Sequence, residues 1–283
     1  ARRAFAATQT WAHRAGEFDA ALATLAEPRV SVVVLAYNNL ALTQACLASI
    51  EAHSDYRNLE VIVVDNASSD GTADWLRDWI DAPSAAGHLR RILLNEENLG
   101  FSGGNNVGLR AATGDFLVLL NNDTYVTPGW VRGLCNHLRE DPGLGLVGPV
   151  TDNIGNEARI ELAYEDMPGM IRAAAGYTRA HPGERYPLHT AAFFCVAMRR
   201  DTFERVGDMD ESFGVGFFED DDYCRRVEQA GLRVACAEDV FVHHHLSASF
   251  DALGSERKRA LFEANKAIYE AKWGPWVPHG YRV

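Results

Sequence analysis

The sequence has neither closely spaced cysteine pairs nor an excess of basic residues. Its five cysteines are odd in number and scattered, without the short spacing of a zinc or redox motif. We therefore expect buried free thiols and a reducing compartment. Lysine and arginine total 27 against 39 aspartates and glutamates, a formal net charge of −12. This balance argues against nucleic acid as a partner, because phosphate backbones are bound by lysine and arginine.

Long apolar runs are also missing. A membrane span needs about 18 consecutive apolar residues, and stretches such as 30–37 and 191–197 are far shorter. Because no signal peptide is visible either, we expect a cytoplasmic protein, with the inner face of the membrane as an alternative place of action. An acidic protein can still bind a phosphate-bearing ligand through a divalent cation. Residue 1 is alanine rather than methionine, so we expect the chain to be part of a longer protein with a neighbouring domain.

The chain divides into an alanine-rich N-terminal helical segment, 1–28, and one larger domain, 29–283. In the domain, short β-branched runs of strand length alternate with segments of helical periodicity. The expected strands are 31–36, 59–65, 89–94 and 115–120, and the expected helices begin near Leu42, span 72–80 and 105–112, and open at Thr127-Pro128. This alternation predicts an α/β fold with a Rossmann-like, mainly parallel central sheet flanked by helices.

The second half has a weaker pattern. Glycine, proline and asparagine are frequent over 144–190, so we expect irregular structure there, with a mobile loop at 175–187. Beyond it, strands are expected at 190–199, 233–235 and 240–242, and helices at 201–206, 220–230 and 255–273.

Polar residues collect where the predicted parallel strands end, at 37–39, 65–66, 95–98 and 121–123. Ligands of open α/β sheets bind at the carboxyl ends of the strands, so these clusters together predict one site. Asp65 can accept a hydrogen bond from a base or a ribose, and we favour this role for it. For Asp70, a ligand-binding role and a structural role at the start of a helix are equally compatible with the sequence. The glycine-rich stretch 98–106 matches neither a phosphate-binding Walker loop nor the dinucleotide fingerprint, and alone it is a weak signal.

Further motifs carry residues suited to metal binding and proton transfer. Asp123 follows an apolar strand and can bind a hard divalent cation; the alternative is an Asx turn that ends the strand. The acids 219–222 lie at a predicted helix start, where such a run is usually a solvated turn. The aromatic and glycine residues around them are also compatible with a partly enclosed site, in which a carboxylate could accept a proton. The histidines 243–245 end a predicted strand and can supply a metal ligand. A zinc site of three histidines is disfavoured because no spaced partner ligand is evident.

Taken in this order, the motifs resemble those of the family 2 glycosyltransferases, whose fold is called GT-A. The resemblance covers residues 29–273. It rests on 31–39, 65–72, 98–105, 120–124, 218–222 and the histidines after Val242. The Phe-Glu-Asp-Asp-Asp form of the acidic motif is similar to that of the bacterial branch that builds surface polysaccharides.

The resemblance implies a binding site for a nucleotide-sugar donor. Tyr37 and Asp65 would contact the nucleotide base, and Asn98 and Asn105 would line the donor site. Asn38 and Asn122, which stand in the same motifs, are assigned to that site as well.

The resemblance also implies a metal site and a catalytic base. Asp123 matches the last acid of the family's Asp-X-Asp motif, with Asn121 in place of the first, and would bind Mn²⁺ or Mg²⁺. His243 is assigned as the second metal-side residue, with His244 and His245 as alternatives. Asp220 resembles the catalytic base, and Asp222 is the second candidate.

The expected activity is therefore inverting transfer of a hexosyl or deoxyhexosyl group from a UDP-, dTDP- or GDP-sugar to a hydroxyl of a glycan or lipid-linked glycan. One alternative is a nucleotidyltransferase acting on sugar phosphates, which would need a stronger basic grip on phosphate than the Tyr-Asn-Asn at 37–39 provides. The other alternative is a catalytically silent nucleotide- or carbohydrate-binding module, which the intact acidic cluster argues against.

Overall fold

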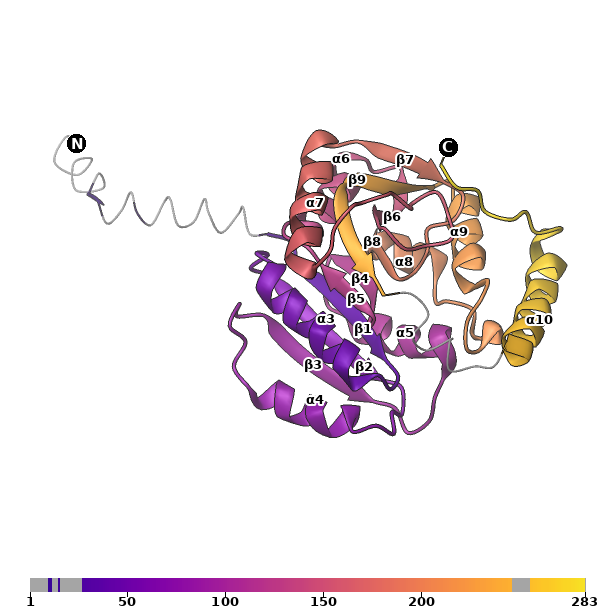
Figure 1. Ribbon diagram of the computed structural model, residues 1–283, viewed down its shortest axis with the longest axis horizontal. Helices are drawn as coiled ribbons and strands as arrows, with labels where there is room; N and C mark the ends of the chain where they lie inside the picture. Colours follow the sequence, from indigo (N-terminus) through magenta and orange to yellow (C-terminus); the bar gives the residue numbers. More distant parts are fainter. Residues whose placement is uncertain (1–9, 12–14, 16–26, 246–254, 283) are drawn as a thin grey trace, which may run out of the picture.

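The computed structural model describes residues 10, 11, 15, 27–245 and 255–282. The predicted helical segment 1–28 lies almost entirely outside these residues and stays a prediction. The described strands form one sheet in the order β3-β2-β1-β4-β8-β6-β9-β5, with β7 paired to β9 (Figure 1). The strands are β1 Val30–Ala36, β2 Leu59–Asp65, β3 Leu89–Leu94, β4 Phe116–Asn121, β5 Thr124–Val126, β6 Leu144–Val150, β7 Arg185–Leu188, β8 Cys195–Arg199 and β9 Arg233–His244.

The first four strands form the parallel half of the sheet. β1 pairs in parallel with both β2 and β4, and β2 pairs in parallel with β3. The chain runs outward from β1 to β3 and then returns to place β4 on the other side of β1. Ligands of such sheets bind where the strand order reverses, which here is the carboxyl end of β1 and β4.

Helices cover both faces of the sheet, as the uninterrupted apolar strands require. Every residue of β1 and β2 is buried. Side chains of α3, α4 and α6 pack on one face, and side chains of α5, α7 and α9 pack on the other. The helices are α3 Leu40–His53, α4 Thr72–Asp81, α5 Gly100–Ala111, α6 Trp130–Glu140, α7 Met167–Ala180, α8 Arg200–Val206, α9 Glu219–Gln229 and α10 Ser255–Trp273.

The carboxyl half of the sheet is mixed. β8 runs antiparallel to β4 and β6, and β5 and β7 run antiparallel to β9, whereas β6 and β9 are parallel. The predicted α/β fold is confirmed, with its parallel pairing concentrated in the first half. The two short strands expected at 233–235 and 240–242 are one continuous strand, β9. The strand expected at 190–199 is shorter than predicted, since β8 begins at Cys195.

The prediction of irregular structure over 144–190 is wrong. This region holds β6, α7 and β7, and the expected mobile loop falls on the end of α7 and the start of β7. Met170 and Ala174 of α7 are buried in the core that contains Phe241 of β9. Packing against a distant strand therefore stabilises a helix whose local sequence, with Pro168 and two glycines, does not favour one.

Two predicted helix starts are also displaced. α5 begins at Gly100 rather than Asn105, and a Cβ at Gly100 would lie 2.2 Å from the carbonyl oxygen of Gly214. The glycine therefore permits a close approach between the start of α5 and the loop before α9. α6 begins at Trp130, because the Thr127 hydroxyl donates to the carbonyl of Phe241 at 2.6 Å instead of capping the helix.

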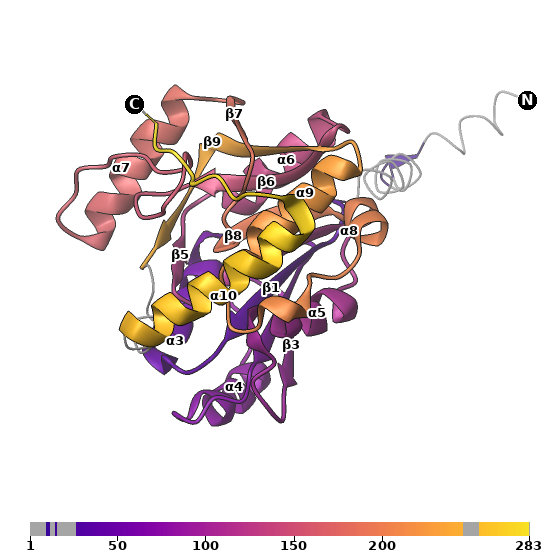
Figure 2. The same cartoon turned by 90° about the vertical axis from the view of Figure 1, so that its right-hand side faces the viewer.

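α10 crosses the molecule beside α9 (Figure 2). Tyr269 of α10 packs with Phe213 and Phe218 in a small aromatic core that is separate from the two cores of the sheet. The loop before α9 thus depends on a helix from the far end of the described chain.

Candidate active site

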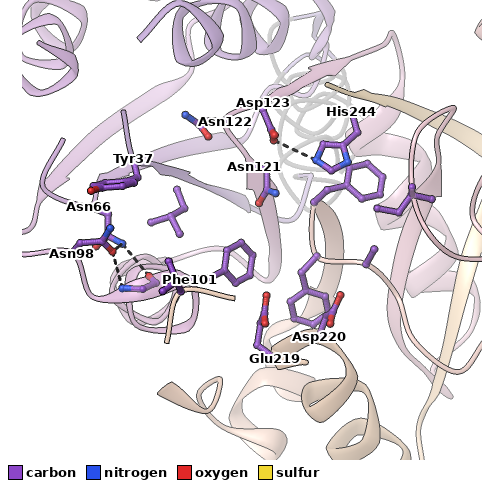
Figure 3. Close-up of a pocket in the computed structure, with 17 residues that line it drawn as sticks. Tyr37, Asn66, Asn98, Phe101, Asn121, Asn122, Asp123, Glu219, Asp220 and His244 are labelled. Atoms are coloured by element: carbon purple, nitrogen blue, oxygen red, sulfur yellow. Dashed lines mark hydrogen bonds and ion pairs between the residues drawn. The ribbon is translucent and has the colours of Figure 1, made fainter. Parts of the chain in front are cut away.

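A cavity opens at the carboxyl ends of β1 and β4 and is bounded on its other side by the start of α9 (Figure 3). Its lining comprises Leu35, Tyr37, Asn66, Asn98, Gly100, Phe101, Asn121, Asn122, Asp123, Ile154, Ala192, Phe193, Phe194, Val215, Glu219, Asp220 and His244. The predicted metal carboxylate, Asp123, and the predicted base, Asp220, therefore face one shared cavity. This is the arrangement on which the sequence interpretation depends.

Asp123 lies in the turn after β4 and is only 8% exposed. Its Oδ1 atom is buried and accepts no hydrogen bond from any described residue. Nε2 of His244 lies 3.4 Å from this Oδ1 atom. Antiparallel pairing of β5 with β9 brings Thr124 opposite His244, which places this imidazole beside the carboxylate.

His243, the residue predicted to face the metal, is directed elsewhere. Its Nδ1 lies 2.9 and 3.0 Å from the two carboxylate oxygens of Asp152, and 3.5 Å from the hydroxyl of Tyr164. Successive side chains of a strand point to opposite faces, so His243 and His244 cannot both face Asp123. His244, which the sequence left open as an alternative, is the histidine that the structure brings to Asp123.

His245 meets Asp123 through its backbone. Its amide donates to the Asp123 carbonyl at 2.9 Å, while its ring packs edge-on against the ring of His243. It therefore stabilises the turn that carries Asp123.

The first turn of α9 carries two carboxyl groups that line the cavity, those of Glu219 and Asp220. Burial, reinforced by the negative charge of Asp221, raises the pKa of Asp220 to about 7. Burial and the charge of Asp220 raise the pKa of Glu219 well above its ordinary value. Asp220 can therefore gain or lose a proton near neutral pH.

Asp222, the second candidate for the base, does not face the cavity. It is fully buried, and its Oδ2 accepts from Nε of Arg226 at 3.0 Å. Its Oδ1 accepts from Nζ of Lys272 and Nε1 of Trp273, each at 2.9 Å. Two residues along a helix rotate a side chain by about 200°, which turns Asp222 away from the cavity that Asp220 faces. Asp222 anchors α10 to α9, and Glu219 is the second carboxyl of the cavity.

The loop before α9 is strained and is held by α10. Phe217 and Phe218 both have φ of 73°, a region that non-glycine residues rarely adopt. The buried side-chain amide of Asn265 donates to the carbonyls of Phe213 at 2.6 Å and Gly216 at 2.7 Å. Sequence reasoning missed Asn265, because nothing in the local pattern of α10 indicates a contact with this loop.

Tyr37, Asn98 and Asn122, which were predicted to bind the donor, all line the cavity. We did not predict Asn66 as a site residue from the sequence, although its hydrogen bonds hold together the residues on this side of the cavity. Its Nδ2 donates to Oδ1 of Asn98 at 2.8 Å and to the Gly100 carbonyl at 3.0 Å. Its Oδ1 accepts from Asn95 and from the backbone amide of Leu99, each at 3.0 Å. Its position directly after Asp65, at the end of a predicted strand, could have identified Asn66 from the sequence.

Three other predicted donor-site residues are not among those that line the cavity. Asn105 is 1% exposed, and its amide donates to the Phe101 carbonyl one turn earlier in α5, so it is directed along the helix instead. Asn38 accepts from the amide of Ser69 at 2.8 Å and joins the loops after β1 and β2. Asp65 is 2% exposed and accepts from the Ser68 amide at 3.2 Å.

Buried carboxylate oxygens without a hydrogen-bond partner are concentrated at this end of the sheet. Within the described ranges they belong to Asp65, Asp123 and Glu219. Leaving a buried polar atom unpaired costs roughly 1–3 kcal/mol, and more for a charged group. Such a set indicates that a ligand or a cation supplies the partners.

The fold and the cavity define an α/β protein with a cavity at the switch point of its sheet and carboxyl groups on both sides of that cavity. The family model described as glycosyl transferase family 2 matches residues 31–207. The chain belongs to this family, which confirms the resemblance seen in the motifs. α9 and α10 lie beyond the matched range.

Two relatives of similar sequence are much longer than this chain. An uncharacterized protein, y4gI, of Sinorhizobium fredii is 28% identical over 256 residues, which cover 87% of this chain and 28% of that protein. The O-antigen biosynthesis protein RfbC of Myxococcus xanthus is 28% identical over 269 residues, covering 88% of this chain and 19% of that protein. The chain thus spans less than a third of either relative.

Solved structures share the fold. The mannosyltransferase PcManGT from Pyrobaculum calidifontis, in complex with GDP-Man and Mn²⁺, has a TM-score of 0.60 at 23% identity, covering 86% of this chain and 65% of that one. GalNAc-T7 with UDP, GalNAc and Mn²⁺ has a TM-score of 0.61 at 17% identity, covering 77% of this chain and 44% of that one. The predicted GT-A fold is confirmed. None of the helices in the described ranges is both long and apolar enough to cross a membrane.

Proposed function

We propose that the chain is an inverting glycosyltransferase that moves a sugar from a nucleoside-diphosphate sugar to an acceptor hydroxyl. The observation that carries this proposal is the shared cavity of Asp123 and Asp220, one with an unpartnered buried oxygen and the other with a pKa near 7. Membership of glycosyl transferase family 2 supports it, as does the likeness to structures solved with GDP-Man or with UDP and GalNAc.

The residues around Asp123 fit a divalent cation. Oδ1 of Asp123 and Nε2 of His244 are an oxygen and an imidazole nitrogen, both suitable ligands for Mn²⁺. No cluster of three or more metal-binding side chains occurs among the residues that the structure describes, so diphosphate oxygens and water would complete the coordination. When bound, Mn²⁺ or Mg²⁺ would stabilise the negative charge that develops on the leaving diphosphate.

The cavity lining also supports a need for this cation. No lysine or arginine is present among the lining residues that the structure describes. A diphosphate in the cavity would therefore have no lysine or arginine side chain beside it to balance its charge. The same observation disfavours a nucleotidyltransferase, which would require lysine or arginine side chains that bind phosphate.

Asp220 would act as the general base. The acceptor oxygen attacks the anomeric carbon as the bond to the diphosphate breaks, and the hydroxyl proton passes to the Asp220 carboxylate. Attack from the face opposite the diphosphate inverts the anomeric configuration. Glu219, whose pKa is raised by burial and by the charge of Asp220, lines the same cavity and can donate a hydrogen bond when it is protonated.

The donor nucleotide would lie along the wall formed by Tyr37, Asn66 and Asn98. The Tyr37 side chain is 39% exposed and offers a ring for a base to stack on. We propose a glycan or lipid-linked glycan as the acceptor, in line with the role in O-antigen biosynthesis of the RfbC relative. Residues 29–283 would form one catalytic domain of a longer protein.

Incubation with UDP-, dTDP- and GDP-sugars tests the proposal. We expect release of nucleoside diphosphate that requires Mn²⁺ or Mg²⁺ and stops when EDTA is added. Formation of pyrophosphate from a sugar phosphate and a nucleoside triphosphate would instead establish a nucleotidyltransferase. Absence of turnover with every donor would leave a silent binding module.

Replacing His244 by alanine should weaken metal activation much more than replacing His243. Loss of one ligand raises the Mn²⁺ concentration for half-maximal activity by about 10-fold or more. His243→Ala is the matched control, because it removes an imidazole from the adjacent position, where it contacts Asp152 rather than Asp123. A Mn²⁺ titration of activity decides between them, and a larger effect of His243→Ala would overturn the assignment.

A further inference from the structure

The segment that follows α10, residues 274–282, returns across the start of α9 towards β7 and β9 (Figures 1 and 2). One end is held by Trp276, whose ring packs against Phe218 with the centroids 5.3 Å apart. The other end is held by Arg282, which forms an ion pair with Glu238 of β9 and lies over the ring of Tyr186, 4.3 Å from its centroid. His279, between these two anchors, is therefore kept in place.

His279 contacts the acidic cluster of the active site directly. Its Nε2 lies 3.2 Å from Oδ1 of Asp221, and its side chain is only 24% exposed. The same Asp221 oxygen accepts from the hydroxyl of Thr190 at 3.0 Å, and the Asp221 amide donates to Oδ1 of Asp220 at 2.9 Å. A continuous set of contacts thus connects His279 through Asp221 to Asp220.

We infer that His279 is a positioning residue for the catalytic base: its imidazolium holds Asp221 in place and balances the negative charge beside Asp220. The inference rests on the proposed role of Asp220. It also assigns a role to the 274–282 segment, which lies outside the range matched by the family model.

The charges around this group give the sign of the effect. Mainly through its hydrogen bond to Asp221, with further contributions from Asp220 and Glu157, the pKa of His279 is raised. In turn, His279 lowers the pKa of Asp220, opposing the increase caused by burial and by Asp221. Other titratable groups that interact with these carboxyls are Glu219, Cys224 and Tyr269.

A base must be ionised to act, so activity should rise with pH through the pKa of Asp220. Removing the positive charge of His279 lets that pKa rise further. The ascending limb of the profile of kcat/KM against pH should then move to higher pH. A residue with only a packing role would lower the rate at all pH values and leave the limb in place.

The test compares His279→Asn, which removes the charge, with His279→Lys, which keeps it. We expect the limb to move up by about half a pH unit or more in His279→Asn and to stay near its original position in His279→Lys. Activity is measured on the full chain with the nucleotide-sugar that gives the most metal-dependent diphosphate release. An unmoved limb in His279→Asn, or an equal shift in both variants, would overturn the inference.

A second readout needs no activity. In a ¹H–¹⁵N NMR titration, with the signal identified by its loss in His279→Asn, the His279 imidazole should titrate above the ordinary histidine pKa of about 6.5. The Asp221→Asn variant should lower that value. Titration at or below the ordinary value in the unmodified chain would show that His279 is not a cation beside Asp221.

Parallel measurement of Asp220→Asn separates the two proposals. If Asp220→Asn keeps its activity, the assignment of the base is wrong, whatever His279 does. If Asp220→Asn is inactive and His279→Asn leaves the limb unmoved, only the role of His279 is wrong. Thermal unfolding of both His279 variants shows whether the fold is retained.

Discussion

Asp220→Asn should lower kcat/KM by about 10²–10⁴-fold while donor binding remains nearly unchanged. Asparagine has almost the same shape as aspartate but cannot accept the proton of the acceptor hydroxyl. Thermal stability should be equal or higher, because the change removes a buried carboxyl whose pKa is raised by its surroundings. Nucleoside diphosphate release, donor binding by calorimetry and thermal unfolding would be measured together.

Asp222→Asn is the matched control for this experiment. Its carboxylate is bound to Arg226, Lys272 and Trp273, so its removal should lower the unfolding temperature markedly. Activity of the remaining folded fraction should fall less than in Asp220→Asn. The assignment of the base fails if Asp220→Asn stays within a few-fold of full activity, or if folded Asp222→Asn is the more defective.

Asp123→Asn is expected to abolish the stabilisation that Mn²⁺ and a nucleoside diphosphate together confer, and to lower kcat/KM by about 100-fold or more. The neutral amide binds a hard cation less well than a carboxylate does. The loss should therefore appear both in thermal shift with Mn²⁺ plus UDP, dTDP or GDP and in turnover. Persistence of both signals would contradict the metal assignment.

Asn121→Asp, which adds a carboxylate two residues before Asp123, provides a gain-of-function control. Asn121 lines the cavity at the first position of the Asn-Asn-Asp motif. A carboxylate there should lower the Mn²⁺ concentration that gives half-maximal activity. No change in this concentration would show that Asn121 does not face the bound cation.

Strands and helices that are defined by their own residues have the bounds predicted from the sequence. β2 and β3 have the predicted bounds, and α10 begins and ends where its pattern indicates. Continuous β-branched runs of strand length have few alternatives inside a protein, because they must be buried on both faces. α7 was missed, since its stability comes from packing against β9 rather than from local propensity.

By itself, the sequence determined the alternation of strands and helices, and with it the end of the sheet where the cavity lies. It also determined which chemical groups lie at that end, including Asp123, the acids of α9 and three adjacent histidines.

Only the tertiary structure decided which neighbour in each group faces the cavity. His244 does so because Asp152 holds His243 on the other side of β9, and Asp220 does so because residues of α10 bind Asp222. Side-chain direction depends on strand register and helix rotation, and partners far away in the chain set both of these.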